Sequence, residues 1–172
     1  IDWRPHLGRI NPARRRIVIR ALYQSMFGCH WRRSDATIGA GLEWRKFWSI
    51  ARKNLRWFDL KANEIAPTKE SLIMLRETRK GYAWVRSPPG KNDPTGEGAT
   101  ARFPSILPLQ SKSWFCPGMA LLELEIDNPC AMEDREDTPL FMDPETGRAF
   151  LTKDFDTIIV YLIRAALCRF HN

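Results

Sequence analysis

Apolar residues recur at helical spacing in three long segments of the chain. Residues 13–27 carry an apolar stripe of period 3.6, preceded by Asn11 and Pro12, a typical helix start, and followed by Gly28, a typical stop. Thr152 is a suitable cap for a last apolar helix. The pattern predicts long helices over residues 13–27, 117–126 and 153–168.

A strand pattern marks the middle of the chain. Tyr82–Arg86 has the aromatic and β-branched content of a strand, and Phe103–Leu109 alternates as a returning strand. Residues 88–98 between them are dense in Gly and Pro, which predicts a hairpin with a long tip. Prolines at positions 104 and 108 limit the second strand to a sheet edge.

The pattern before this hairpin is mixed. Trp44–Phe58 predicts a helix that passes into a short strand through Leu55, Trp57 and Leu60, and Thr68 predicts the cap of a short helix ended by Gly81. Helices, then a hairpin, then helices indicate an α+β fold, mostly helical with a small antiparallel sheet. We expect one domain, or one large piece of a domain, over residues 1–172.

Charge is divided unevenly along the chain. Residues 1–60 hold 13 Lys/Arg and 4 Asp/Glu, residues 61–115 hold 9 and 5, and residues 116–172 hold 5 and 11, so nets of +9, +4 and −6 give the total of +7. A basic N-terminal part favours a polyanionic partner such as nucleic acid, although many basic domains bind none.

The four cysteines form no C-x-x-C pair, so we expect free thiols and no zinc or other metal site. The chain has no secretory signal and no apolar run of about 18 residues. These features predict an intracellular protein without a membrane partner, nuclear if the organism is a eukaryote.

Two short constellations of residues contain side chains suited to binding or catalysis. In the first, Trp31-Arg32-Arg33-Ser34-Asp35, two arginines at an element boundary can hold an anionic group while the acid orients a guanidinium. In the second, Gly90-Lys91-Asn92-Asp93-Pro94, a lysine on a hairpin tip can reach into a site built elsewhere and supply a proton, with Asp93 positioning the tip. Taken singly, the first is more often a surface arginine pair beside a helix N-cap at Ser34, and the second is more often an ordinary polar turn.

In this order, the two constellations resemble the catalytic domain of tyrosine recombinases, of the phage integrase-like kind and closest to the Crypton-type and algal or protist branch. The resemblance covers about residues 13–168. A helix precedes the R-R-S-D segment, a hairpin carries K-N-D, a C-P-x-x-A-L-L helix follows, and Pro139-Leu140-Phe141 precedes a turn and a helix at Thr152. It implies that Arg32, with Arg33 as the register alternative, is the first catalytic arginine, and that Lys91 is the catalytic lysine.

The family's later motifs have no match in the chain. H-x-x-R is expected after the helix that ends near Cys168, where His171 is a candidate for its first residue, and the nucleophilic tyrosine comes later still. Tyr23 and Tyr82 do not occupy the nucleophile's place, and Tyr161 lies in an apolar helix and is interpreted as core. We therefore expect a partial catalytic domain that does not cleave or rejoin DNA by itself.

The resemblance implies covalent phosphoryl transfer, in which a tyrosine attacks a DNA phosphodiester and forms a 3′-phosphotyrosyl link. Arg32 would neutralise the non-bridging oxygens and Lys91 would protonate the leaving 5′ oxygen, with Arg33, Asp35 and Asp93 in support. It implies no metal ion and no cofactor. The implied partner is double-stranded DNA, with self-association of the full-length protein on DNA.

Two other hypotheses remain open from the sequence. The chain can be a non-catalytic DNA-binding remnant in which Arg32 and Lys91 only touch phosphate. It can also be an RNA-binding or protein-interaction domain that uses Trp44–Trp57 as a stacking surface, whereas a packed core is the alternative interpretation of those tryptophans.

Overall fold

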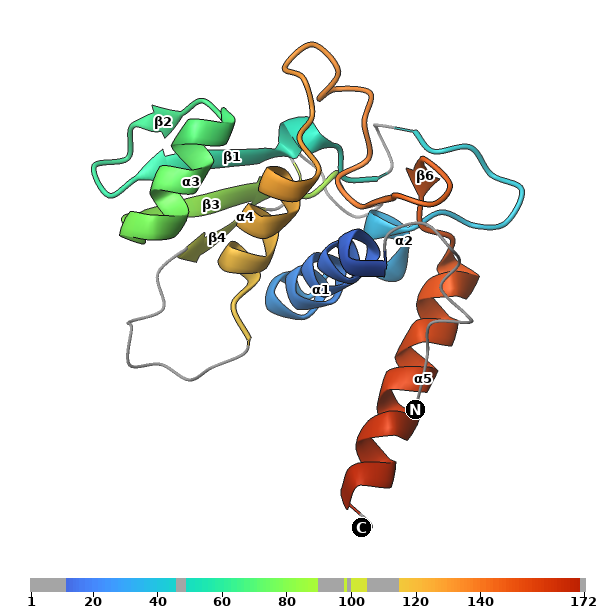
Figure 1. Cartoon of the computed structure of the whole chain (residues 1–172). Helices are drawn as coiled ribbons and strands as arrows, with labels where there is room; N and C mark the ends of the chain where they lie inside the picture. Colours follow the sequence, from blue (N-terminus) through green and yellow to red (C-terminus); the bar gives the residue numbers. More distant parts are fainter. Residues whose placement is uncertain (1–11, 46–48, 90–97, 99, 105–114, 171–172) are drawn as a thin grey trace.

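The structure, a computed structural model, describes residues 12–45, 49–89, 98, 100–104 and 115–170 (Figure 1). The described residues form an α+β fold of helices packed on a small antiparallel sheet, as the sequence predicts. The helices are α1 (Pro12–Cys29), α2 (Arg33–Ala36), the 3-10 turn η2 (Arg52–Asn54), α3 (Lys69–Thr78), α4 (Pro117–Asp127) and α5 (Thr152–Phe170). The strands are β1 (Leu55–Asp59), β2 (Glu64–Ile65), β3 (Gly81–Arg86), β4 (Thr100–Pro104), β5 (Met142–Asp143) and β6 (Arg148–Ala149).

The main sheet has the strand order β2-β1-β3-β4, and every neighbouring pair is antiparallel. Leu55 pairs with Val85 at one end of the β1–β3 ladder, and Asp59 pairs with Gly81 at the other. The predicted hairpin is the β3–β4 pair, and among the described strands β4 lies at the edge of the sheet, as Pro104 at its end indicates. Its second strand begins at Thr100, three residues earlier than predicted.

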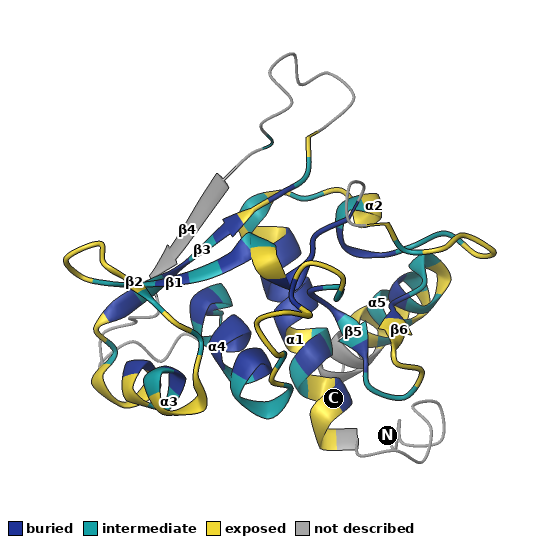
Figure 2. Cartoon of the chain, turned by 90° about the horizontal axis from the view of Figure 1, so that it is seen from above, coloured by how far each residue is buried: buried dark blue, intermediate teal, exposed yellow. Residues whose placement is uncertain are grey.

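One face of the sheet lies against α3 and α4, and α1 packs on the other side of α4 (Figure 2). The inward residues of the two central strands, Leu55, Trp57, Ala83 and Val85, are each at most 2% exposed. Every residue from Ala21 to Met26 of α1 is also buried, so this part of the helix is enclosed all round rather than along one stripe.

Within Trp44–Phe58, the predicted strand through Leu55 and Trp57 is confirmed as β1, whereas the helix predicted before it is wrong for the described residues 49–54. Only the single turn η2 forms there, and the chain then enters β1. The N–H of Arg52 donates to the Thr138 carbonyl at 2.9 Å, and Ala51 bridges to Pro139. Backbone pairing with a distant loop replaces the helical hydrogen bonds, and apolar spacing does not reveal such a pairing.

The C-terminal helix α5 is docked at its start and extends away from the molecule (Figure 1). Phe155 is buried, and its ring stacks on Tyr23 with 4.6 Å between centroids. Further along, Val160, Leu162 and Ile163 are exposed. Tyr161 is half-buried, so its interpretation as a core residue is wrong.

Cys29, Cys116 and Cys130 are free thiols, and burial raises the pKa of Cys29 to about 12. Within the described ranges, no helix is both long and apolar enough to cross a membrane. The same part of the chain holds no group of three or more His, Cys, Asp or Glu side chains arranged to bind a metal ion.

Candidate nucleic-acid interface

The segment Trp31–Asp35 is fixed at both of its ends. His30 takes a left-handed conformation with φ 53° that ends α1, and the Trp31 N–H donates to the Met26 carbonyl at 3.2 Å. The Trp31 ring packs against Phe141, with 6.5 Å between centroids. At the other end, the Asp35 carbonyl accepts from the Ile50 N–H at 2.9 Å. The backbone that carries Arg32 and Arg33 is therefore held in place at both ends.

Asp35 acts on the backbone of Arg32 and not on its guanidinium. Its Oδ2 accepts a hydrogen bond from the Arg32 N–H at 2.9 Å, which closes the first turn of α2. The Asp35 N–H in turn donates to the Arg32 carbonyl at 3.0 Å. The expectation that Asp35 orients a guanidinium is therefore wrong for Arg32. The carboxylate instead fixes the backbone of Arg32, from which the side chain extends.

The two arginines have different surroundings. Nη1 of Arg33 lies 2.6 Å from both carboxylate oxygens of Asp156 on α5, in an exposed ion pair. Arg32 is exposed, and its guanidinium makes no ion pair with any residue in the described ranges. Of the two register alternatives, Arg32 is therefore the one whose guanidinium is available to an anion.

Lys91 and Asp93 lie outside the described residues, but the base of their hairpin is defined. Arg86 pairs with Thr100 at the end of the β3–β4 ladder. Beyond it, Gly98 has φ 72°, and a Cβ built there would lie 2.0 Å from the Ser87 carbonyl oxygen. Only glycine fits this position without displacement, so the two arms of the hairpin meet closely before the tip.

The base of the hairpin and α2 lie at the same end of β1. Leu55, the first residue of β1, pairs with Val85 near the end of β3. Ile50, five residues before Leu55, binds the backbone of Asp35. Figure 2 shows α2 and the end of β3 on the same side of the molecule. The fold thus brings Arg32 and the base of the hairpin toward one edge, although they are far apart in sequence.

A buried network of ion pairs joins the elements next to this edge. Glu125 of α4 accepts from Arg52 at 2.6 Å and from Arg135 at 2.7 Å. Arg135 also donates to the carbonyls of Arg52 and Leu55 at 3.0 and 3.1 Å. All three charged side chains are at most 5% exposed. The network ties α4 and the 129–137 loop to η2, the segment between Ile50 and β1.

A second buried cluster joins α1 to the β5–β6 turn. Arg15 contacts Asp143 at 2.9 Å and Glu145 at 2.5 Å. The Arg15 guanidinium is therefore buried between two carboxylates. The sequence pattern reveals neither cluster, since their members are as many as 130 residues apart.

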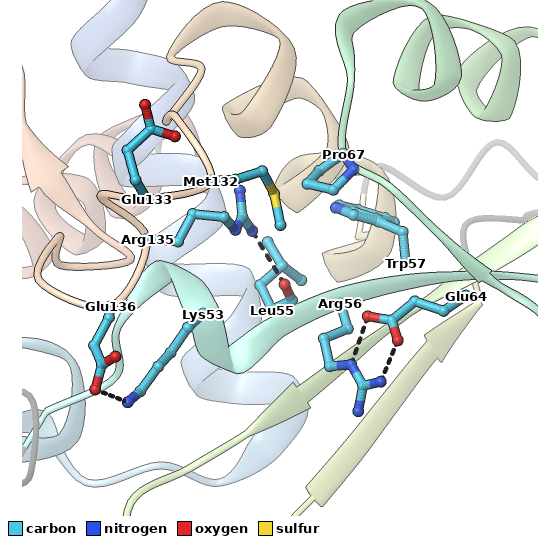
Figure 3. A pocket seen from close by; sticks show the side chains of 10 residues that line it. All are labelled: Lys53, Leu55, Arg56, Trp57, Glu64, Pro67, Met132, Glu133, Arg135 and Glu136. Carbon is cyan, nitrogen blue, oxygen red and sulfur yellow. Dashed lines mark hydrogen bonds and ion pairs between the residues drawn. The ribbon is translucent and has the colours of Figure 1, made fainter.

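A pocket lies between β1 and the 129–137 loop (Figure 3). Its charged groups are largely engaged with one another: Lys53 binds Glu136 at 2.7 Å, and Nε of Arg56 binds Glu64 at 2.7 Å. The indole N–H of Trp57 is buried and has no hydrogen-bond partner among the described residues. The paired charges make this pocket part of the support for β1 rather than a strong anion site. Its lining residues are Lys53, Leu55, Arg56, Trp57, Glu64, Pro67, Met132, Glu133, Arg135 and Glu136.

The tryptophans of Trp44–Trp57 do not form one stacking surface. Trp57 is fully buried, which confirms the core interpretation for this residue. Trp44 is half-buried, and Trp48 lies outside the described residues. Among the described residues, half-buried aromatic side chains of β1 and β3 contact one another instead.

Searches of protein-family models, of curated proteins and of solved structures found no match to this chain.

Proposed function

We propose that this chain binds duplex DNA as part of a tyrosine recombinase-type catalytic domain, with Arg32 as a phosphate-binding residue. The observation that carries the proposal is the contrast within the arginine pair: Arg33 is paired with Asp156, whereas Arg32 is exposed on a backbone fixed by Asp35. A guanidinium held in this way is ready to donate to a phosphate without first breaking an ion pair.

The placement of the hairpin supports the same proposal. The β1–β3 register and the Ile50–Asp35 hydrogen bond direct the hairpin base and α2 to one edge. Lys91, carried by that hairpin, would then act near the phosphate that Arg32 binds. The excess of Lys and Arg in residues 1–115 favours a polyanion at this part of the molecule.

In the proposed reaction, a tyrosine oxygen attacks the scissile phosphorus, the P–O5′ bond breaks, and a 3′-phosphotyrosyl link and a free 5′ hydroxyl result. Arg32 would stabilise the negative charge that builds on the non-bridging oxygens. Lys91 would give its proton to the leaving 5′ oxygen. Asp35 would act as a positioning residue for Arg32. Self-association on DNA and a nuclear location in a eukaryote belong to this proposal and follow from the resemblance alone.

A binding assay with a fluorescently labelled DNA duplex over a series of salt concentrations tests the proposal. If the chain neutralises several phosphates, affinity falls steeply and linearly on a log–log plot, by about 0.9 in slope for each phosphate contacted. Absence of duplex binding at low salt would contradict both the recombinase proposal and its non-catalytic variant, in which the same residues only hold DNA.

A further inference from the structure

The solvent side of the main sheet carries a group of aromatic and basic residues on its two central strands. We call this group the outer sheet face. Strict alternation along β1 and β3 turns one set of residues inward to the core and the other set outward. The outward residues are Arg56, Phe58, Tyr82, Trp84 and Arg86.

The aromatic residues of the outer sheet face contact each other across the strands. Phe58 and Tyr82 stack with 5.3 Å between centroids and 13° between ring planes, and Trp84 meets Phe58 edge-on at 6.3 Å. The Arg56 guanidinium carbon lies 5.3 Å from the Phe58 centroid and 5.1 Å from the Trp84 centroid. These contacts fix the rings in place before any ligand arrives.

These three rings remain half-buried although they are large and apolar, and Arg86 beside them is exposed. In Figure 2 the described helices α1, α3 and α4 lie on the opposite side of the sheet. A contiguous aromatic surface on the side of a sheet away from its described helices is typical of a binding surface, because burial would otherwise be expected for such residues.

Two observations identify the kind of ligand. The rings lie on the central strands of a four-stranded antiparallel sheet, an arrangement on which unpaired bases stack in the RNA recognition motif. Arginines accompany the rings on both central strands, Arg56 on β1 and Arg86 on β3. Aromatic rings interleaved with cations fit a chain of flat bases joined by phosphates better than they fit an aliphatic peptide.

We propose that the outer sheet face binds unpaired nucleotides of single-stranded DNA or RNA. Bases stack on Trp84 and Tyr82, and the phosphates between them meet Arg86, whereas Arg56 stays paired with Glu64 and holds the rings in place. The inference does not rest on the proposed recombinase function, because it concerns a different surface and a different form of nucleic acid.

Fluorescence anisotropy of labelled oligonucleotides measures this binding directly. We expect the wild-type chain to bind both oligo-dT and oligo-U, and the ratio of the two affinities reports whether the site distinguishes the sugars. Trp84→Ala is expected to weaken both by about tenfold or more, the range observed for loss of one stacked base. Trp84→Phe keeps a ring and is expected to retain most of the affinity.

Phe27→Ala is the matched control, because Phe27 is an exposed aromatic residue of α1 outside the outer sheet face. Arg86→Glu and Arg76→Glu form a second pair, since both arginines are exposed and Arg76 lies on α3. If Trp84→Ala does not fold, the comparison of Arg86→Glu with Arg76→Glu tests the proposal in its place, together with Trp84→Phe. Weaker binding only in the sheet variants supports the proposal.

No binding of either oligonucleotide at low salt would overturn the proposal, as would equal affinities of the wild type, Arg86→Glu and Trp84→Ala. A change in self-association without a change in oligonucleotide binding would also overturn it and would identify a protein contact. Arg32→Ala separates the two proposals: it should weaken duplex binding and leave oligonucleotide binding intact, whereas Trp84→Ala and Arg86→Glu should weaken oligonucleotide binding and leave duplex binding intact.

Discussion

The Asp35 carboxylate accepts a 2.9 Å hydrogen bond from the backbone N–H of Arg32 and leaves the guanidinium of this arginine exposed. This relationship leads to a prediction that opposes simple electrostatics. Asp35→Ala makes the chain more positive, which by charge alone would strengthen DNA binding. We expect it instead to weaken duplex binding, by roughly two- to tenfold, because the first turn of α2 loses its closing bond.

Two variants control this prediction in an anisotropy assay with duplex DNA. Asp35→Asn keeps an acceptor oxygen and should bind at least as tightly as the wild type. Asp156→Ala removes an acid of equal charge and frees Arg33, so it should strengthen binding. If Asp35→Ala strengthens binding as much as Asp156→Ala does, Asp35 does not position Arg32.

The buried network around Glu125 predicts a large loss of stability on neutralisation. Glu125→Gln leaves the guanidinium groups of Arg52 and Arg135 buried without a counter-charge, and we expect the free energy of unfolding in urea to fall by about 3–5 kcal/mol. Glu123→Gln, two residues away, breaks an exposed pair with Arg20 and should cost at most about 1 kcal/mol. Equal losses in the two variants would show that the network has no special role.

Gly98 predicts a strict requirement for glycine at the base of the β3–β4 hairpin. Gly98→Ala adds a methyl group 2.0 Å from the Ser87 carbonyl oxygen at a positive φ, so it should reduce the free energy of unfolding by more than about 2 kcal/mol. Gly41 also has a positive φ, 76°, but has open space around its Cβ position. Gly41→Ala should therefore cost only the backbone term, about 1 kcal/mol. Thermal unfolding monitored by circular dichroism compares the two, and a larger loss in Gly41→Ala would refute the close contact.

The Arg56–Glu64 pair predicts a carboxyl pKa that depends on the arginine. The pKa of Glu64 lies below its ordinary value of 4.5 because the Arg56 side chain hydrogen-bonds to it. Stability from this pair is present above pH 4.5 and is lost as the pH falls through the lowered value. An NMR titration should return the Glu64 pKa to its ordinary value in Arg56→Ala and leave it low in Arg76→Ala. A low pKa in both variants would assign the shift to another cause.

Much of the fold could be predicted from local pattern, because helices and hairpins close within short stretches of chain. Thr68 caps α3 by accepting from Ser71 N–H, and the turn after Asp143 joins β5 to β6 through Gly147 with φ 66°, both as their residue types indicate. The pairing of β1 with β3 was not predicted, since β2 and α3 separate the two strands along the chain. Periodicity within a strand contains no information about its partner.

The candidate site was predicted only in part, for the same reason. The sequence draws attention to Arg32 and Arg33, but only the fold shows that Asp156, 123 residues away, engages Arg33. Trp57 and Trp84 are of the same residue type, yet one is buried and the other reaches the surface, because the inward side of each strand depends on where α4 packs. The alternation of Gly81–Arg86 was a usable signal for the outer sheet face. The alternation did not show which set of residues faces the solvent.

The salt dependence of duplex binding in Arg32→Ala, compared with Arg33→Ala and Arg76→Ala, tests the phosphate-binding role of Arg32 most directly. If Arg32 binds a phosphate, its removal should weaken binding by roughly tenfold or more and reduce the log–log salt slope by about 0.9. Arg33→Ala and Arg76→Ala remove the same charge and should change both quantities less. An Arg32→Ala variant with the affinity and slope of Arg76→Ala would contradict the account.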